Sequence, residues 1–162
     1  MVSGHCTKGF ARFGTVKDGI SKFLEPPKAN LRYGADQAGM TIRLDYENYI
    51  KTGIEFFDGK YNLSTVVAHT TSDWSVIALD RPVEYIWIKA IRRHDAVEIF
   101  YSFDDIEYHM MRNAWMEANH PVKIGMFAAC PDGDGFKAAF SDFQVTHLPD
   151  AVRSEWLKRN SE

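Results

Sequence analysis

The sequence predicts an all-β protein, and three observations support this fold class. Aromatic residues make up 14% of the 162 residues and stand among Val, Ile and Thr in short segments. Turn signals separate these segments at intervals of about 8–12 residues. Residues 49–57 alternate between apolar and polar positions, which is typical of a half-buried strand. Because no internal segment has a convincing helical period, we expect two packed antiparallel sheets, an all-β sandwich.

The clearest element is a hairpin over residues 49–68. One face of its first strand is expected to be core, and it carries Ile50, Thr52, Ile54 and Phe56. The opposite face carries Lys51, Gly53 and Glu55. Asp58-Gly59 supplies a two-residue turn that tolerates positive φ, and Tyr61 to Ala68 returns as the second strand.

The same pattern predicts the other strands. They are 37–44, 74–79, 85–92, 96–103, 106–112, 122–129 and 136–145. Arg93-His94-Asp95 joins two of them, and Asp104-Asp105 forms the next turn. Residues 20–33 contain Pro26-Pro27 and are expected to form an irregular loop.

The chain is expected to form one domain, residues 1–148, followed by a short helical tail over 149–162. Asp150 can cap that helix, and Val152 and Trp156 lie four residues apart on one side of it. The apolar stripe is narrow, so the tail is either a strap across the sandwich or a frayed end.

Composition and charge exclude several functional classes. The net charge is −3 and no basic run exceeds Arg92-Arg93, so capture of nucleic acid or of an anionic membrane is not expected. No apolar stretch approaches the roughly 18 residues that span a bilayer, and the N-terminus lacks an apolar signal region, so we expect a soluble, cytoplasmic protein. Cys6 and Cys130 are too few for a disulfide framework and are expected to be reduced.

The residues predict no metal, no cofactor and no catalytic centre. The six histidines are scattered, with no pair at ligand spacing. Residues 132–135 (Asp-Gly-Asp-Gly) lack the further acidic ligands of a calcium loop, and turn chemistry accounts for the acidic cluster at 45–48. Paired carboxylates, such as Asp45 with Glu47, lack the repeated acid-x-acid spacing of sandwich glycosidases. Nucleophilic catalysis by a cysteine stays open beside the alternative of an inert buried thiol.

Two clusters are poorly explained by strand formation alone. Asp36-Gln37 stands just before a strand of small residues, and Ser72-Asp73-Trp74-Ser75 places a Trp between short polar residues, where it could stack on a sugar or anchor a partner. Together with one face of the 49–57 strand they predict a ligand-binding patch of Asp36, Gln37, Lys51, Glu55, Asp73 and Trp74. The alternative is a surface ion-pair network above a Trp that packs in the core.

These clusters also carry a resemblance to a known family. The segments 36–40, 48–55 and 72–75 resemble the enolase-regulator proteins, a domain of unknown function in the concanavalin A-like lectin and glucanase superfamily. The similarity continues through 87–89, 93–98, 101–102 and 125–131, and Tyr49 stands where the family usually has Trp. The resemblance implies a jelly-roll sandwich and a regulatory, metabolism-linked role, without a catalytic motif. It also implies that one or two N-terminal strands are missing here, through divergence or an altered gene model.

The function predicted on these grounds is non-catalytic: binding of a protein, such as a metabolic enzyme, or of a small polar ligand in a regulatory role. The alternative is a glycan-binding module or a glycoside hydrolase, suggested by the superfamily and by aromatic residues such as Trp74 and Trp87.

Overall fold

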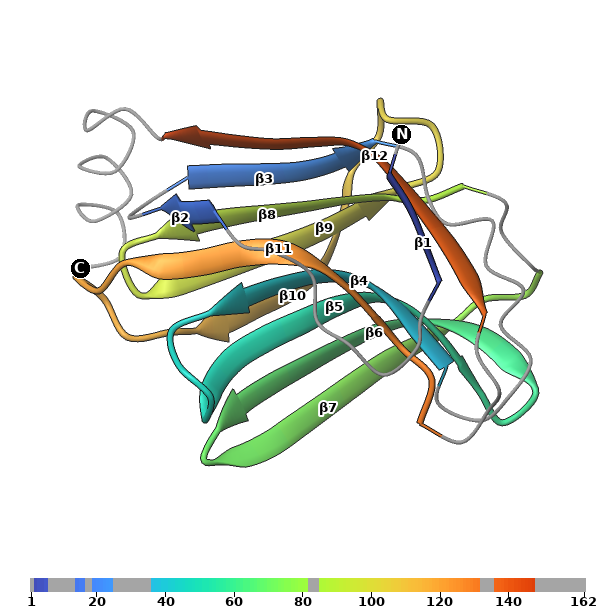
Figure 1. The fold of residues 1–162 in the computed structure, drawn as a ribbon, viewed down its shortest axis with the longest axis horizontal. Coiled ribbons are helices and arrows are strands. Elements are labelled where there is room, and N and C mark those ends of the chain that lie inside the picture. Colours follow the sequence, from blue (N-terminus) through green and yellow to red (C-terminus); the bar gives the residue numbers. More distant parts are fainter. Residues whose placement is uncertain are drawn as a thin grey trace.

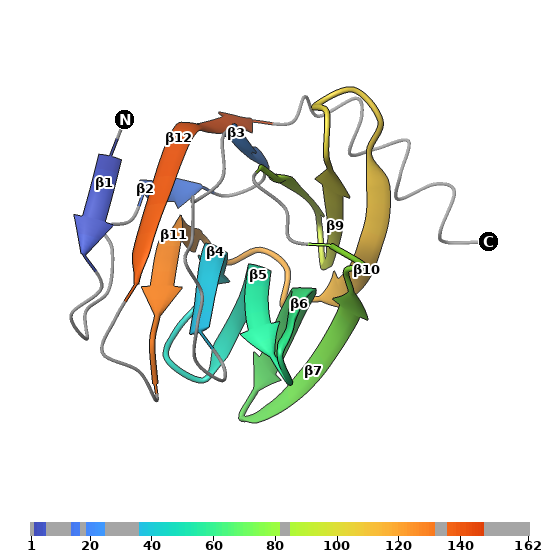
Figure 2. The ribbon, with the colours of Figure 1, turned by 90° about the vertical axis from the view of Figure 1, so that its right-hand side faces the viewer.

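The chain folds as a sandwich of two six-stranded antiparallel sheets (Figure 1). The computed structural model describes residues 2–5, 14–16, 19–24, 36–81, 85–131 and 136–147. Figure 2 shows the two sheets facing each other across the core. The structure therefore confirms the predicted all-β sandwich, and the predicted tail over 149–162 lies outside the described residues. No helix occurs in the described ranges, hence none that could cross a membrane.

Sheet I has the order β1-β12-β3-β8-β9-β10. Its strands are β1 (Val2–His5), β12 (Lys137–His147), β3 (Gly19–Leu24), β8 (Trp87–Arg93), β9 (Ala96–Ser102) and β10 (His109–Trp115). Sheet II has the order β2-β11-β4-β5-β6-β7. Its strands are β2 (Gly14–Val16), β11 (Val122–Ala129), β4 (Asp36–Arg43), β5 (Asn48–Phe57), β6 (Lys60–His69) and β7 (Thr71–Ala78).

The predicted hairpin is confirmed as β5 and β6. Asp58 and Gly59 have φ angles of 51° and 73°, the left-handed pair that a two-residue turn requires, and Phe57 pairs with Lys60 across them. The chain then reverses again at Thr70, whose φ is 63°, so that His69 pairs with Thr71. These two tight turns place β5, β6 and β7 side by side in sheet II.

The predicted core row of β5 is also confirmed. Ile50 and Ile54 are buried, and Phe56 is half-buried. Thr52 is buried as well, and its hydroxyl lies 3.0 Å from that of Thr65 on β6, so each satisfies the other's hydrogen-bonding capacity. The opposite residues of β5 consequently face away from the core.

Two predictions about the strands need correction. The expected loop over 20–33 is wrong in its first part, because Gly19–Leu24 forms β3 between β12 and β8. The rest of the expected loop, with Pro26-Pro27, lies outside the described residues. The strand expected at 106–112 begins only at His109, since Asp104 Oδ1 accepts the backbone N–H groups of Ile106 and Glu107 at 2.9 Å and holds them in a turn. The expectation of missing N-terminal strands stays a prediction.

Candidate functional site

The outer face of sheet II, opposite the core, brings separate sequence segments into rows across the strands. The pairing register places one row through the middle of the sheet: Phe127, Gly39, Gly53, Ser64 and Val76. The row on one side contains Gln37 and Glu55, and the row on the other contains Lys51, Val66 and Trp74. We call this surface the trough. It consists of the middle row together with five residues of the two flanking rows: Gln37, Glu55, Lys51, Val66 and Trp74.

The floor of the trough is backbone, because two glycines face each other across β4 and β5. A Cβ atom on Gly39 would lie 2.1 Å from the carbonyl oxygen of Thr52, and one on Gly53 would lie 2.2 Å from that of Ala38. No side chain fits there without forcing the strands apart. A shallow hollow, open to solvent, lies beside Gly53 and is lined by Gln37, Lys51, Glu55, Ser64, Val66 and Phe127.

Glu55 is the acid of the trough, and both of its carboxylate oxygens accept hydrogen bonds. Gln37 Nε2 donates to Oε1 at 2.6 Å, and Trp74 Nε1 donates to Oε2 at 3.0 Å. The same indole N–H lies 3.0 Å from the hydroxyl oxygen of Ser64. Only 3% of Glu55 is exposed, so these donors replace the water that a buried carboxylate loses. Four residues from four strands are thereby fixed in one network.

Trp74 lies on the outer face at the edge of sheet II, with 44% of its surface exposed. Its ring packs edge-on against Phe57, with 5.1 Å between ring centroids. The alternative that Trp74 packs in the core is therefore wrong. The side chain keeps a free aromatic surface beside a hydrogen-bonded carboxylate.

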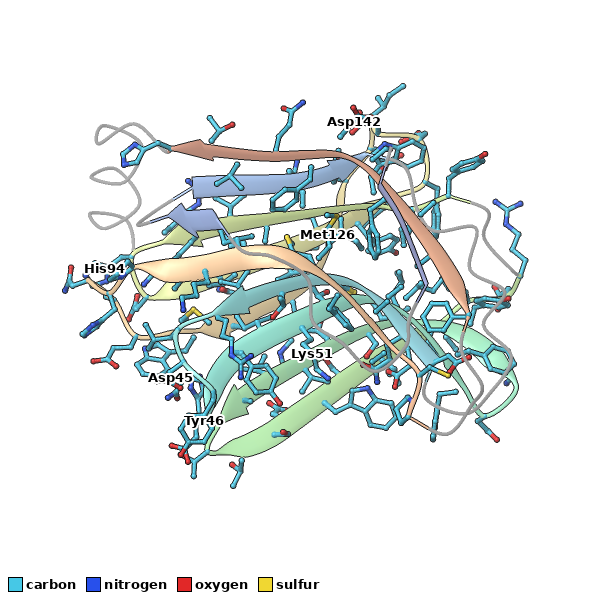
Figure 3. All side chains as sticks on the ribbon, in the orientation of Figure 1. Asp45, Tyr46, Lys51, His94, Met126 and Asp142 are labelled. Atoms are coloured by element: carbon cyan, nitrogen blue, oxygen red, sulfur yellow. The ribbon has the colours of Figure 1, made fainter. Side chains whose placement is uncertain are left out.

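Lys51 is the cation of the trough. Its side chain is half-buried over the middle of sheet II (Figure 3), and its ammonium lies 5.6 Å from the centre of the Phe127 ring. Burial lowers the pKa of Lys51, and the nearby charge of Glu55 opposes this effect. Across the part of the chain that the structure describes, the Lys51 ammonium makes no hydrogen bond or ion pair.

Two predicted patch residues do not join this group. Asp36 precedes Gln37 and Asp73 precedes Trp74, and alternation along a strand turns each of them to the opposite side of sheet II. Asp36 is fully buried on the core side. Asp73 forms an ion pair with Arg112 of β10, which links the open edges of the two sheets. The structure thus brings together Gln37, Lys51, Glu55 and Trp74 and separates Asp36 and Asp73 from them.

Sequence reasoning missed several residues of the trough: Gly39, Gly53, Ser64, Val66 and Phe127. A signal was present for two of them. Once the Asp58-Gly59 turn fixes the register, Ser64 must pair with Gly53 and Val66 with Lys51. Phe127 carries no such signal, because its position depends on β11 pairing with β4 across about 85 residues of sequence.

The other candidate sites have structural explanations. Asp45 Oδ1 accepts the backbone N–H groups of Glu47 at 2.9 Å and Asn48 at 2.8 Å, and hydrogen bonds from Asn48 lower the pKa of Asp45. This is the turn chemistry predicted for 45–48. Cys130 is half-buried and outside any disulfide. Within the described ranges no three His, Cys, Asp or Glu residues could hold a metal ion, and residues 132–135 and Cys6 lie outside those ranges.

This geometry defines a class: a two-sheet β-sandwich domain of jelly-roll type with a polar and aromatic hollow on the outer face of one sheet. The chain belongs to the family described as "Protein of unknown function (DUF1349)", which matches residues 28–148. The predicted family and fold are both confirmed.

Two relatives share 30% sequence identity with this chain. "Regulation of enolase protein 1" of Saccharomyces cerevisiae aligns over 111 residues, 68% of this chain and 56% of that protein. An uncharacterized protein of Emericella nidulans aligns over 115 residues, 66% of this chain and 58% of that protein. The chain therefore spans little more than half the length of these relatives.

Solved structures show the same fold. A functionally unknown protein of Saccharomyces cerevisiae superposes with a TM-score of 0.77 and 24% identity, covering 88% of this chain and 80% of that one. A GH43 protein of Bacillus licheniformis superposes with a TM-score of 0.67 and 14% identity, covering 82% of this chain and 28% of that one. At these identities the likeness concerns the fold alone.

Proposed function

We propose that this chain is a non-catalytic, cytoplasmic binding domain that seats a protein or a small polar ligand over the trough and acts in a regulatory role. The observation that carries the proposal is the state of Glu55: both of its carboxylate oxygens accept hydrogen bonds from donors of the trough, while the Lys51 ammonium and the exposed ring of Trp74 remain available to a ligand. The trough is thus prepared for binding and has no acid free for proton transfer.

The name of the yeast relative supports a metabolic setting, and enolase is the partner to test first. A hydrolytic role needs two carboxylates about 5–10 Å apart around the reacting bond. Among the described residues that line the trough, Glu55 is the one acid. A glycan-binding module stays the second candidate, because the exposed ring of Trp74 lies beside hydrogen-bonding groups, a combination that suits a sugar ring.

The proposal is tested by binding of purified enolase, measured by calorimetry with the wild-type chain and with Ser64→Tyr, which fills the hollow. Val66→Trp narrows the hollow from its wall and serves as a second variant. Asn113→Tyr, at an exposed position of β10, is the matched control. We expect both trough variants to weaken binding at least tenfold and the control to bind like wild type, with unchanged circular dichroism.

Equal binding by all four proteins would show that the trough is not the site. If wild type ignores enolase but gives signals on a glycan array that Ser64→Tyr loses, the glycan-binding candidate replaces the first. Release of reducing sugar by the wild-type chain would contradict the non-catalytic assignment.

A further inference from the structure

We propose that the trough recognises a carboxylate carried on a short aliphatic stem, which docks between the Lys51 ammonium and the Ser64 hydroxyl. The inference rests on the proposed function and names the chemistry of the ligand. It applies equally to an acidic side chain of a protein partner and to a small carboxylic acid.

Lys51 and Ser64 both have hydrogen-bond donors to spare. Trp74 donates its indole N–H to Glu55, and Gln37 donates one of its two amide N–H groups to the same carboxylate. The Lys51 ammonium has three N–H donors and, within the described ranges, no acceptor. Ser64 accepts from Trp74 through its oxygen, so its own O–H proton is not used in that hydrogen bond. Ser64 is 6% exposed and lines the hollow. A half-buried ammonium without an acceptor is costly, and an incoming acceptor would remove that cost.

These two donors are also close enough to share one ligand group. Lys51 pairs with Val66, and Gly53 pairs with Ser64, so Lys51 and Ser64 are diagonal neighbours on adjacent strands. Diagonal neighbours on one face of a sheet are about 7–8 Å apart at their backbones, within reach of a long side chain. Because Gly53 has no side chain, nothing from β5 stands between them. A carboxylate above Gly53 can accept from both.

The charge of the whole face favours an anion. The four rows that cross β4 at positions 37, 39, 41 and 43 contain three cations, Lys51, Arg43 and Lys123, against one carboxylate, Glu55. Three positive charges minus one negative charge leave an excess of two. Arg43 is held by the carbonyl of Asp45 at 2.6 Å, which leaves Lys51 as the cation inside the hollow while the others add to the attraction.

The local charge and the walls of the hollow select a monoanion with an apolar stem. Lys51 and Glu55 cancel within the trough, so one added negative charge leaves a net of −1, whereas a dianion such as phosphate leaves −2 beside the Glu55 carboxylate. Val66 and the Phe127 ring form apolar walls, which suit methylene groups. A short aliphatic carboxylate combines these properties.

The test is a titration of the full chain with propionate and, separately, with its uncharged analogue propionamide, followed by amide chemical shifts in NMR. We expect saturable shifts at residues 51–55 and 64–66 with propionate and at least tenfold weaker binding of propionamide. Lys51→Met should weaken propionate binding at least tenfold, Lys51→Arg should restore most of it, and Lys60→Met, at the exposed end of the hairpin, should leave it unchanged. Equal affinity for the two probes, or wild-type affinity in Lys51→Met, would overturn the inference.

Two further measurements complete the test. The first shows whether the carboxylate belongs to a protein side chain or to a small acid, and the second separates this inference from the proposed function. Tighter binding of a blocked Ala-Glu-Ala peptide than of propionate indicates a protein side chain, and the reverse order indicates a small acid; either order supports the carboxylate chemistry. If Ser64→Tyr abolishes enolase binding while Lys51→Met binds enolase and propionate like wild type, the trough keeps its function and the carboxylate inference fails. If Ser64→Tyr leaves enolase binding intact, the proposed function fails by itself.

Discussion

The outer faces of the two sheets treat a half-buried lysine in opposite ways. On sheet I, the Lys89 ammonium lies 3.6 Å from the centre of the Tyr108 ring and 5.5 Å from that of Phe100. On sheet II, the Lys51 ammonium lies 5.6 Å from the centre of the Phe127 ring, at the edge of a hollow. The same architecture therefore places the lysine of one face over two aromatic rings and leaves a hollow beside the lysine of the other.

The difference comes from local chemistry. The turn held by Asp104 carries Tyr108 over sheet I, and Arg93 and Glu98 form an ion pair at 2.9 Å on the same face. On sheet II the position beside Lys51 on the same strand face is Gly53, which offers no side chain. Paired glycines across two strands thus create a hollow without any change of fold.

The largest expected effect tests whether the glycine floor keeps the two faces different. Gly53→Ala should lower the free energy of unfolding by about 3 kcal/mol or more, because its Cβ would collide with backbone that cannot move without separating β4 from β5. Gly59→Ala is the control: it has open space but a φ of 73°, so it should cost only about 1–2 kcal/mol. Urea denaturation measures the free energy of unfolding of both variants. A smaller loss for Gly53→Ala than for Gly59→Ala would contradict the claim that no side chain fits at Gly53.

The next effect compares the carboxylates of the two faces. Trp74→Phe keeps an aromatic ring against Phe57 but removes the N–H donor of buried Glu55, and should cost about 2 kcal/mol. Glu98→Gln removes the more exposed pair with Arg93 and should cost less than about 1 kcal/mol. Thermal denaturation shows which variant loses more stability. A larger loss in Glu98→Gln than in Trp74→Phe would mean that the hydrogen bonds to Glu55 do not stabilise the fold.

A third pair of variants compares the lysines directly. Lys89→Met should lose about 0.5–1 kcal/mol, since the Tyr108 and Phe100 rings lose their cation. Lys51→Met should leave the free energy of unfolding unchanged or raise it, because it removes a charge that is desolvated without a bound acceptor. Chemical denaturation gives the change in the free energy of unfolding of each variant relative to the wild type, and the sign of that change is compared. A clear loss in Lys51→Met would show that the Lys51 ammonium already has a favourable partner in the free protein.

The smallest effect is a pH dependence of opposite sign on the two faces. Burial lowers the pKa of Lys51 below its ordinary 10.5, so the unfolded chain binds more protons in the window just below 10.5 and stability relative to Lys51→Met rises with pH there. Burial and the hydrogen bond to Asp105 raise the pKa of Tyr108 above its ordinary 10.0, so stability relative to Tyr108→Phe falls as pH rises above 10.0. Alkaline urea titrations check both slopes, and parallel curves for wild type and Lys51→Met would contradict the first.

Local sequence signals determined much of this protein. The Asp58-Gly59 turn and the alternation of residues 49–57 fix the β5–β6 hairpin, its register and its core face. The resemblance motifs pointed to Gln37, Lys51, Glu55 and Trp74, which the structure does bring together. These features depend on short-range rules, the period of two and the left-handed turn, that every strand and hairpin obeys.

Tertiary structure decided the rest. Asp36 and Asp73 belong to the same motifs, but strand alternation turns them to the core side and to Arg112 of the other sheet. The insertion of β3 between β12 and β8, and of β11 beside β4, depends on pairing between segments far apart in sequence, which no local pattern specifies. The hollow exists only because Gly39 meets Gly53 across two strands, and a glycine in a single strand does not reveal which residue it will face.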